Sequence, residues 1–157
     1  MALMRLCSRA ERSSGDAKRL MATWEVPEQD RIGVLRRLKE ERFIDDERYA
    51  TAFVREKVNL SGWGEYKIRS ALRRKGIAED IIARAIREIS PEQSTQRLVE
   101  RLQRKLKTVK YTSLYDLKNK LIRHGIALGF SMETLLPHVK QLTRDIKTDE
   151  ECDNFLY

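Results

Sequence analysis

The sequence contains little of the residue types that build disulfide frameworks, metal centres or membrane spans. Its 157 residues include two cysteines, three prolines and seven glycines, and aromatic side chains make up 7%. Cys7 and Cys152 lie near opposite ends of the chain without metal-ligand spacing, so we predict two reduced thiols. No apolar run approaches the roughly 20 residues that cross a bilayer, and the first residues lack the features of a signal peptide. We therefore predict a cytoplasmic protein that does not associate with membranes.

No catalytic or metal-binding constellation is visible in the sequence. His124 and His138 fall on different predicted helices, with no cysteine or carboxylate at ligand spacing. Helix capping explains the carboxylates of residues 45–47, because acidic metal sites usually draw ligands from several elements. Residues 62–64 place two glycines around a tryptophan, but they lack a Walker lysine or serine and follow no strand. We predict a monomeric protein that is not an enzyme and needs no cofactor or metal.

Charge, in contrast, is abundant and unevenly distributed. Charged residues make up 36% of the chain and its net charge is +8. Residues 61–76 carry +4, residues 91–107 and 108–130 carry +3 each, and residues 148–157 carry −4. A solvated helix face explains any one basic run, but three successive runs favour a surface that binds a polyanion or an acidic protein groove. We interpret the acidic end as a solvated terminus that could compete weakly for this surface.

Apolar residues recur about every 3.6 positions without convincing strand alternation, which predicts an all-α fold. The clearest helix is expected over residues 78–89. A capping box should follow it, with Ser90 at N-cap, Pro91 at N1 and Gln93 at N3, and Ser113 should open a later helix. The stripes that should be buried are Ile81, Ile82, Ala85, Ile86 and Ile89; Leu98, Leu102, Leu106 and Val109; Leu117, Leu121 and Ile122; and Leu135, Leu136, Val139 and Leu142.

The order of helices and turns repeats along the chain. A basic helix leads through Lys75-Gly76-Ile77 into an apolar helix, and the same order surrounds Leu128-Gly129-Phe130. A weaker copy surrounds Trp24-Glu25-Val26-Pro27. Units of this size bury little surface alone, so we expect them to pack into an elongated right-handed or curved array. The predicted organisation is three tandem three-helix units at residues 1–43, 44–90 and 91–147, followed by an acidic C-terminal tail at 148–157.

The segment 43–77 is the most informative part of the chain. Asp45 is a good N-cap for the helix that follows, whose first turn is acidic, as the helix dipole favours. Tyr49 and Phe53 are four residues apart and share one face of that helix. Glycines on either side of a tryptophan then precede a second, basic helix, which Gly76 should end as its C′ residue.

This combination of residues and spacings resembles the RecX regulators of the RecA recombinase. The resemblance is dense over residues 43–77 and extends more loosely along nearly the whole chain, and it also implies tandem three-helix units. One position departs from the family: Arg42 stands where members usually carry glycine, so either Arg42 is left-handed or the preceding helix ends differently. The residues that carry the resemblance are Asp45, Asp46, Arg48, Tyr49, Phe53, Arg55, Gly62, Trp63, Gly64 and Gly76.

The resemblance implies a regulator in recombination, DNA repair and the SOS response that docks on the RecA–DNA filament, along its helical groove. Docking would restrain the ATPase, strand-exchange and co-protease activities of RecA by binding one filament state. A basic face would speed encounter with the filament and make binding salt-dependent. The candidate contacts, which could instead be only a solvated face, are Lys67, Arg69, Arg73, Arg74, Lys75, Arg101, Arg104 and Lys105.

Two other functions stay open. Basic three-helix units also suit a stand-alone helix-turn-helix protein in the DNA major groove, and a third possibility is an adaptor for an unrelated acidic protein. A DNA reader should bind one duplex sequence tightly without RecA, whereas a filament regulator should bind single- or double-stranded DNA weakly and require RecA. Trp63 either stacks on a base or packs at the junction of two helices.

Overall fold

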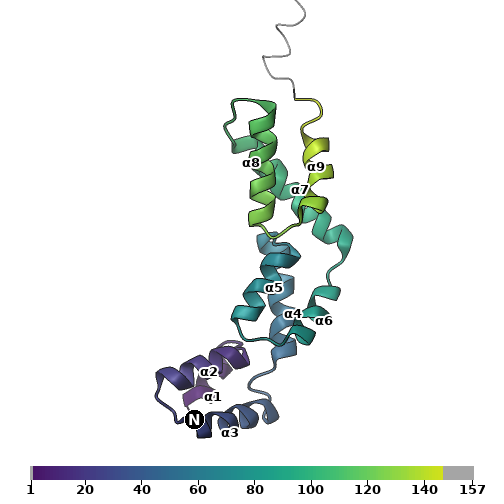
Figure 1. Cartoon of the computed structure of the whole chain (residues 1–157). Helices are drawn as coiled ribbons and strands as arrows, with labels where there is room; N and C mark the ends of the chain where they lie inside the picture. The colour runs from purple at the N-terminus through teal and green to yellow at the C-terminus, as the bar shows by residue number, and fades with distance from the viewer. Residues whose placement is uncertain (1, 147–157) are drawn as a thin grey trace, which may run out of the picture. The chain divides into compact units, whose positions relative to one another are not determined.

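In a computed structural model of the chain, residues 2–146 are described (Figure 1). This part of the chain contains α-helices, one π-helical turn and no strand, which confirms the all-α prediction. No helix within residues 2–146 is long and apolar enough to cross a membrane. The elements are α1 (Ala2–Arg9), α2 (Ser14–Thr23), α3 (Glu28–Glu40), α4 (Asp46–Glu56), η1 (Lys57–Ser61), α5 (Glu65–Arg74), α6 (Glu79–Arg87), α7 (Pro91–Thr108), α8 (Leu114–Ala127) and α9 (Met132–Leu142).

The chain divides into two compact bodies. Body 1 comprises Met1–Lys57 and Ile68–Ile89, and body 2 comprises Val58–Lys67 and Ser90–Tyr157. The boundaries of the three predicted three-helix units therefore stay a prediction. The acidic tail at 148–157 and Cys152 lie outside the described residues.

Body 1 is held together by two packed helix pairs, α2 with α3 and α4 with α6. Met21, Leu38 and Ile44 form part of one buried cluster at the first pair. Ile82 on α6 is fully buried, as its place in the predicted stripe requires. The exposed fraction of Ile32 on α3 is 75%, so the apolar residues of that helix are only partly used in the core.

Body 2 contains a three-helix core in which α8 packs against both α7 and α9 (Figure 1). Its buried side chains match most of the predicted stripes. Leu136 is an exception, because 49% of its surface is exposed on the outer side of α9. The core residues are Leu98, Leu102, Leu117, Leu121, Phe130, Leu135 and Val139.

The helix starts follow the local capping signals. The Asp45 carboxylate accepts a hydrogen bond from the backbone N–H of Arg48 at 2.9 Å, and the Ser113 hydroxyl accepts one from Asp116 at 3.1 Å. Ser90 caps α7 as predicted, accepting from the Gln93 N–H at 3.3 Å. The Gln93 side chain does not close the capping box but donates to Asn59 Oδ1 at 2.8 Å.

The predicted repeat reappears in the turns that end α2, α5 and α8. Glu25, Gly76 and Gly129 have positive φ angles of 55°, 73° and 96°. Each donates its N–H three residues back, and the next residue donates five residues back, which is the Schellman pattern. The same pattern ends α3, where Arg42 has a φ of 57°. Arg42 therefore adopts the left-handed conformation, the first of the two predicted alternatives.

Candidate binding surface

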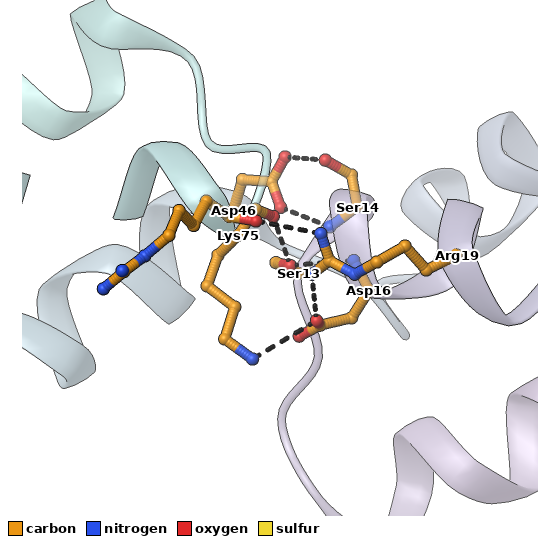
Figure 2. Close-up of polar contacts among 7 residues, drawn as sticks. Ser13, Ser14, Asp16, Arg19, Asp46 and Lys75 are labelled. Carbon is orange, nitrogen blue, oxygen red and sulfur yellow. Dashed lines mark hydrogen bonds and ion pairs between the residues drawn. The ribbon is translucent and has the colours of Figure 1, made fainter. Parts of the chain in front are cut away.

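Asp46, one of the residues that carry the resemblance to RecX, joins two helices of body 1. Its carboxylate accepts hydrogen bonds from the Ser14 backbone N–H at 2.8 Å and the Ser14 hydroxyl at 2.5 Å (Figure 2). Ser13, the N-cap of α2, donates its hydroxyl to the Lys75 carbonyl at 2.7 Å. Asp46 therefore helps to fix the N-terminus of α2 to α4, and Ser13 fixes it to the turn after α5. The role of Asp46 in this structure is the alignment of helices.

A pair of glycines makes this alignment possible. A Cβ atom on Gly15 would overlap the Lys75 carbonyl, and a Cβ atom on Gly76 would lie 2.8 Å from the Gly15 Cα. Backbone atoms line both sides, so neither side can yield by rotating a side chain. Gly76 is required by this close approach as well as by its positive φ. We call this contact between Gly15 and Gly76 the first glycine joint.

Ion pairs surround the first glycine joint. Asp16 Oδ1 lies 2.5 Å from an Arg19 guanidinium nitrogen and 3.3 Å from Lys75 Nζ. Burial alone would raise the pKa of Asp16, but the bonds from Arg19 and Lys75 outweigh it and the pKa is lowered. Arg19 also donates to the Arg74 carbonyl at 2.8 Å. The positive charge on Lys75 is therefore matched by a carboxylate of the same body.

The other residues of the resemblance in α4 also have structural partners. Arg48 Nε lies 2.8 Å from Glu11 Oε1, and an Arg55 guanidinium nitrogen lies 3.6 Å from Glu88 Oε2. The rings of Tyr49 and Phe53 stack with their centroids 6.1 Å apart. Burial, followed by nearby carboxylates, raises the pKa of the Tyr49 phenol. These side chains stabilise α4 against its neighbours.

Body 2 contains a second glycine joint, between Gly64 and Gly129. The Gly64 N–H donates to the Leu128 carbonyl at 2.7 Å, and the Tyr66 N–H donates to the Gly129 carbonyl at 3.1 Å. A Cβ atom on Gly64 would lie 2.5 Å from the Gly129 oxygen. The N-terminus of α5 thus packs on the turn after α8, as the N-terminus of α2 packs on the turn after α5. In the second joint the backbone itself makes the hydrogen bonds.

Gly62 and Trp63 position two cations beside the second joint. A Cβ atom on Gly62 would lie 2.8 Å from Arg101 Nε, so the missing side chain leaves room for the arginine. Arg101 donates to the Leu60 carbonyl at 2.8 Å. Lys67 Nζ lies 4.5 Å from the centre of the Trp63 ring and donates to the Ala127 carbonyl at 3.1 Å. Trp63 is half-buried, which favours its packing role over an open stacking platform.

Two predicted basic residues in the body 1 part of α5 have a carboxylate partner that the sequence did not reveal. Both Arg69 and Arg73 bond to Glu79 at the start of α6, and Arg73 Nε lies 2.8 Å from Glu79 Oε2. These bonds from Arg73 and Arg69 lower the pKa of Glu79. Arg74 is exposed at the end of the helix. Ile68, Ala71 and Leu72 are buried on the opposite side, as predicted.

Three of the predicted basic residues of body 2 affect the pKa of His124. Lys105, Arg101 and Lys67 all act electrostatically on His124, whose pKa is lowered first by burial and then by these three cations. No carboxylate within residues 2–146 forms an ion pair with any of the three. Arg104 is exposed on α7, where its charge helps Arg97 to lower the pKa of Glu100. The sequence had suggested only a solvated or packing role for His124.

Comparisons with known proteins find one family repeatedly. A family model described as RecX, second three-helix domain, matches residues 45–86. A regulatory protein RecX from Lactococcus lactis subsp. cremoris (strain SK11) is 29% identical over 145 residues, covering 90% of this chain and 54% of the relative. A regulatory protein RecX from Clostridium botulinum (strain Eklund 17B / Type B) is 32% identical over 106 residues, covering 66% and 49%. The chain spans about half the length of the curated relatives it matches.

Two solved structures have a similar fold. A crystal structure of regulatory protein RecX matches with a TM-score of 0.81 at 23% identity, over 92% of this chain and 70% of that one. The crystal structure of RecX from Lactobacillus salivarius matches with a TM-score of 0.80 at 20% identity, over 91% and 93%. The comparisons confirm the resemblance to the RecX family that the sequence indicated.

Proposed function

We propose that this RecX-type chain binds the RecA–DNA filament and lowers the ATPase, strand-exchange and co-protease activities of RecA. Binding to one assembly state of the filament shifts the assembly equilibrium by mass action, so catalysis by the regulator itself is not required. The matched relatives are named regulatory proteins, which supports a regulatory rather than a catalytic role. The observation that carries the proposal is the match to the RecX second three-helix domain at residues 45–86.

The residues of the candidate binding surface fall into two groups, those that position helices and those that are candidate contacts with the filament. Asp46, Gly64 and Gly76 hold helices at fixed positions, and Arg48 and Arg55 are paired with Glu11 and Glu88. The eight predicted basic residues are the candidate contacts with the filament. Within this set, the cations of body 2 lack carboxylate partners among the described residues and are the better candidates for contact with a polyanion.

The test is the DNA-dependent ATPase rate of the cognate RecA with increasing amounts of this protein. We expect the rate to fall at substoichiometric amounts, because one bound regulator affects many filament subunits. Strand exchange should fall in parallel. An unchanged ATPase rate at equimolar protein would contradict the proposal.

A stand-alone DNA-binding protein is the second candidate, favoured by the uncompensated cations of body 2. It is distinguished by binding in the absence of RecA. A sequence-specific reader should discriminate between duplexes by on the order of a thousandfold. The proposed regulator should bind all free DNA weakly and with similar affinity.

A further inference from the structure

One side of α9 carries exposed apolar residues followed by a cation. Met132 and Leu136 are 47% and 49% exposed, and they lie four residues apart on one face of the helix. Lys140, four residues further along, is exposed in the last turn. Leu135 and Val139 are buried in the core of body 2, so the exposed residues lie beside that core. We call Met132, Leu136 and Lys140 the α9 stripe.

Charge is distributed unevenly along α9. Glu133 is the acidic residue of its first turn and Lys140 the basic residue of its last turn. Arg144 follows shortly after the end of the helix, with Asp145 next to it in the sequence. Among residues 2–146, neither Lys140 nor Arg144 has an ion-pair partner. The stripe therefore begins with apolar side chains near a carboxylate and ends with cations that lack a partner.

The acidic tail carries the same chemistry in the opposite order. Its residues lie outside the described part of the chain, but its sequence has acidic residues at 149–151 and the apolar run Phe-Leu-Tyr at 155–157. The tail therefore changes from acidic to apolar along the chain, whereas the stripe changes from apolar to basic. A segment that turns back along α9 brings its carboxylates to Lys140 and its apolar side chains to Leu136 and Met132.

We propose that the α9 stripe is a docking surface for the acidic tail of the same chain. α9 has 11 residues and is about 16 Å long, and the residues from 147 to 155 can span up to about 30 Å, so the tail reaches the whole stripe. Because the tail belongs to the same chain, its effective concentration at α9 is on the order of millimolar, and few contacts are needed. This proposal concerns body 2 alone and does not depend on the proposed function.

The apolar and the charged contacts have different roles in this docking. Surface ion pairs contribute little to affinity, so contact with Met132 and Leu136 supplies most of it. The charges set the direction of the tail, because Glu133 repels carboxylates from the start of α9 and Lys140 attracts them to its end. The order of side chains along both segments therefore specifies one antiparallel arrangement.

Cys152 offers a position for a probe inside the tail. In the full chain with Cys7→Ala it is the only cysteine, so a nitroxide label attached to it broadens the amide NMR signals of nearby residues. Cys152 lies between the acidic residues and the apolar run, so in the docked chain its label should lie next to the middle of the stripe. We expect the strongest broadening within α9 at residues 136–140.

Variants separate docking from general stickiness. Leu136→Ser should lower the ratio of docked to undocked chain by on the order of tenfold, because it removes apolar contact. Ile126→Ser is the matched control, because Ile126 is also 49% exposed but lies on α8, and it should leave the broadening unchanged. Lys140→Glu should lower the ratio roughly threefold. Adding Glu150→Lys should restore much of this loss, which a misfolded variant could not do.

Broadening that declines steadily from residue 146 towards residue 132 in the parent would overturn the proposal. Equal losses for Leu136→Ser and Ile126→Ser, or no recovery with Glu150→Lys, would also overturn it. The parent result is repeated with a mixture of isotope-labelled chain and nitroxide-labelled chain. The same broadening in this mixture would assign the docking to a second copy and reject docking within one chain. Because RecA is absent from these measurements, their failure is distinguishable from failure of the proposed function.

Discussion

The two glycine joints share the same close backbone packing, but different hydrogen bonds hold them together. In each, the N-terminus of a helix packs on a Schellman turn so closely that neither side can carry a Cβ atom. The first joint is held by side chains, because Ser13 bonds to Lys75 and Ser14 bonds to Asp46. The second is held by backbone hydrogen bonds from Gly64 and Tyr66. The same backbone geometry therefore does not require the same polar residues.

The difference has an electrostatic consequence. Around the first joint, Lys75 pairs with Asp16, and on the same helix Arg73 pairs with Glu79. Around the second joint, Lys67 and Arg101 bond to backbone carbonyls, and no carboxylate within residues 2–146 pairs with them. Lys75 and Arg73 of body 1 thus have carboxylate partners, whereas Lys67 and Arg101 of body 2 are bonded to backbone carbonyls. Variants can test each half of this comparison.

The largest effect is expected from Gly15→Ala and Gly64→Ala. Both place a Cβ atom against backbone, so each should lower the free energy of unfolding by about 2–4 kcal/mol, measured by urea denaturation. Gly33→Ala is the control, because nothing lies within 4 Å of its Cβ position and the residue is inside α3. It should stabilise the protein by about 0.5–1 kcal/mol. If Gly15→Ala or Gly64→Ala were as stable as Gly33→Ala, the corresponding joint would have to open without cost.

Asp46→Ala tests the dependence of the first joint on side chains. The Asp46 side chain is 9% exposed, and its removal leaves the Ser14 N–H and hydroxyl without their acceptor. We expect a loss of about 2–3 kcal/mol in the free energy of unfolding. Hydrogen exchange should show the loss first at amides of α2. Glu92→Ala, which removes an exposed carboxylate of body 2 that accepts one hydrogen bond from the Ser90 hydroxyl, should cost less than about 1 kcal/mol.

Asp16 should make body 1 sensitive to acid. Its pKa is lowered from the ordinary value of 3.8, so its stabilising contribution is present above that pH and is lost as the pH falls through the lowered pKa. Asp16→Asn should cost about 1 kcal/mol near neutral pH, and this cost should shrink progressively as the pH falls below 3.8. Asp80→Asn, at an exposed ion pair, should change stability by less than about 0.5 kcal/mol at either pH. If the stability of Asp16→Asn and that of the parent depended on pH in the same way, the proposed role of the Asp16 ion pairs would be refuted.

Arg42→Gly should give the smallest effect, and in the stabilising direction. Arg42 has a φ of 57°, a left-handed conformation that glycine adopts more readily than a residue with a side chain. Relief of this conformation should raise the free energy of unfolding by about 0.5–1 kcal/mol in urea denaturation. Arg36→Gly, inside α3, should lower it by about 1 kcal/mol. If Arg42→Gly does not raise the free energy of unfolding, the Arg42 side chain must contribute a compensating contact.

The sequence predicted what local chemistry determines. Asp45, Ser90 and Ser113 cap the expected helices because an N-cap bonds to a backbone group only a few residues away. Gly76 and Gly129 end their helices because the Schellman turn needs a positive φ. Most of the apolar stripes that the sequence predicted contribute buried residues to the cores. Leu136 was wrongly placed in the core, because the stripe of α9 is narrower than its apolar sequence.

The candidate site was harder to predict, because its contacts join distant positions. Ser14 and Asp46 are 32 residues apart, and Arg73 meets Glu79 only when the chain turns into α6. Counting charges within one helix therefore overestimated the free positive charge of α5. The lowered pKa of His124 gave no signal in the sequence, because burial and cations on other helices cause it. The sequence of residues 13–16 is typical of a helix cap and could have been predicted as one. The bond from Ser14 to Asp46 could not have been predicted, because the two residues are far apart in the sequence.

The most direct test of the central claim compares the salt dependence of binding to RecA–DNA filaments for two double variants. Arg73→Ala with Arg74→Ala removes two charges from body 1, and Arg104→Ala with Lys105→Ala removes two from body 2. Each lost phosphate contact should reduce the slope of log affinity against log salt by about one. We predict a clear reduction for the body 2 pair and less than half of it for the body 1 pair. An equal or larger reduction for the body 1 pair would contradict the account.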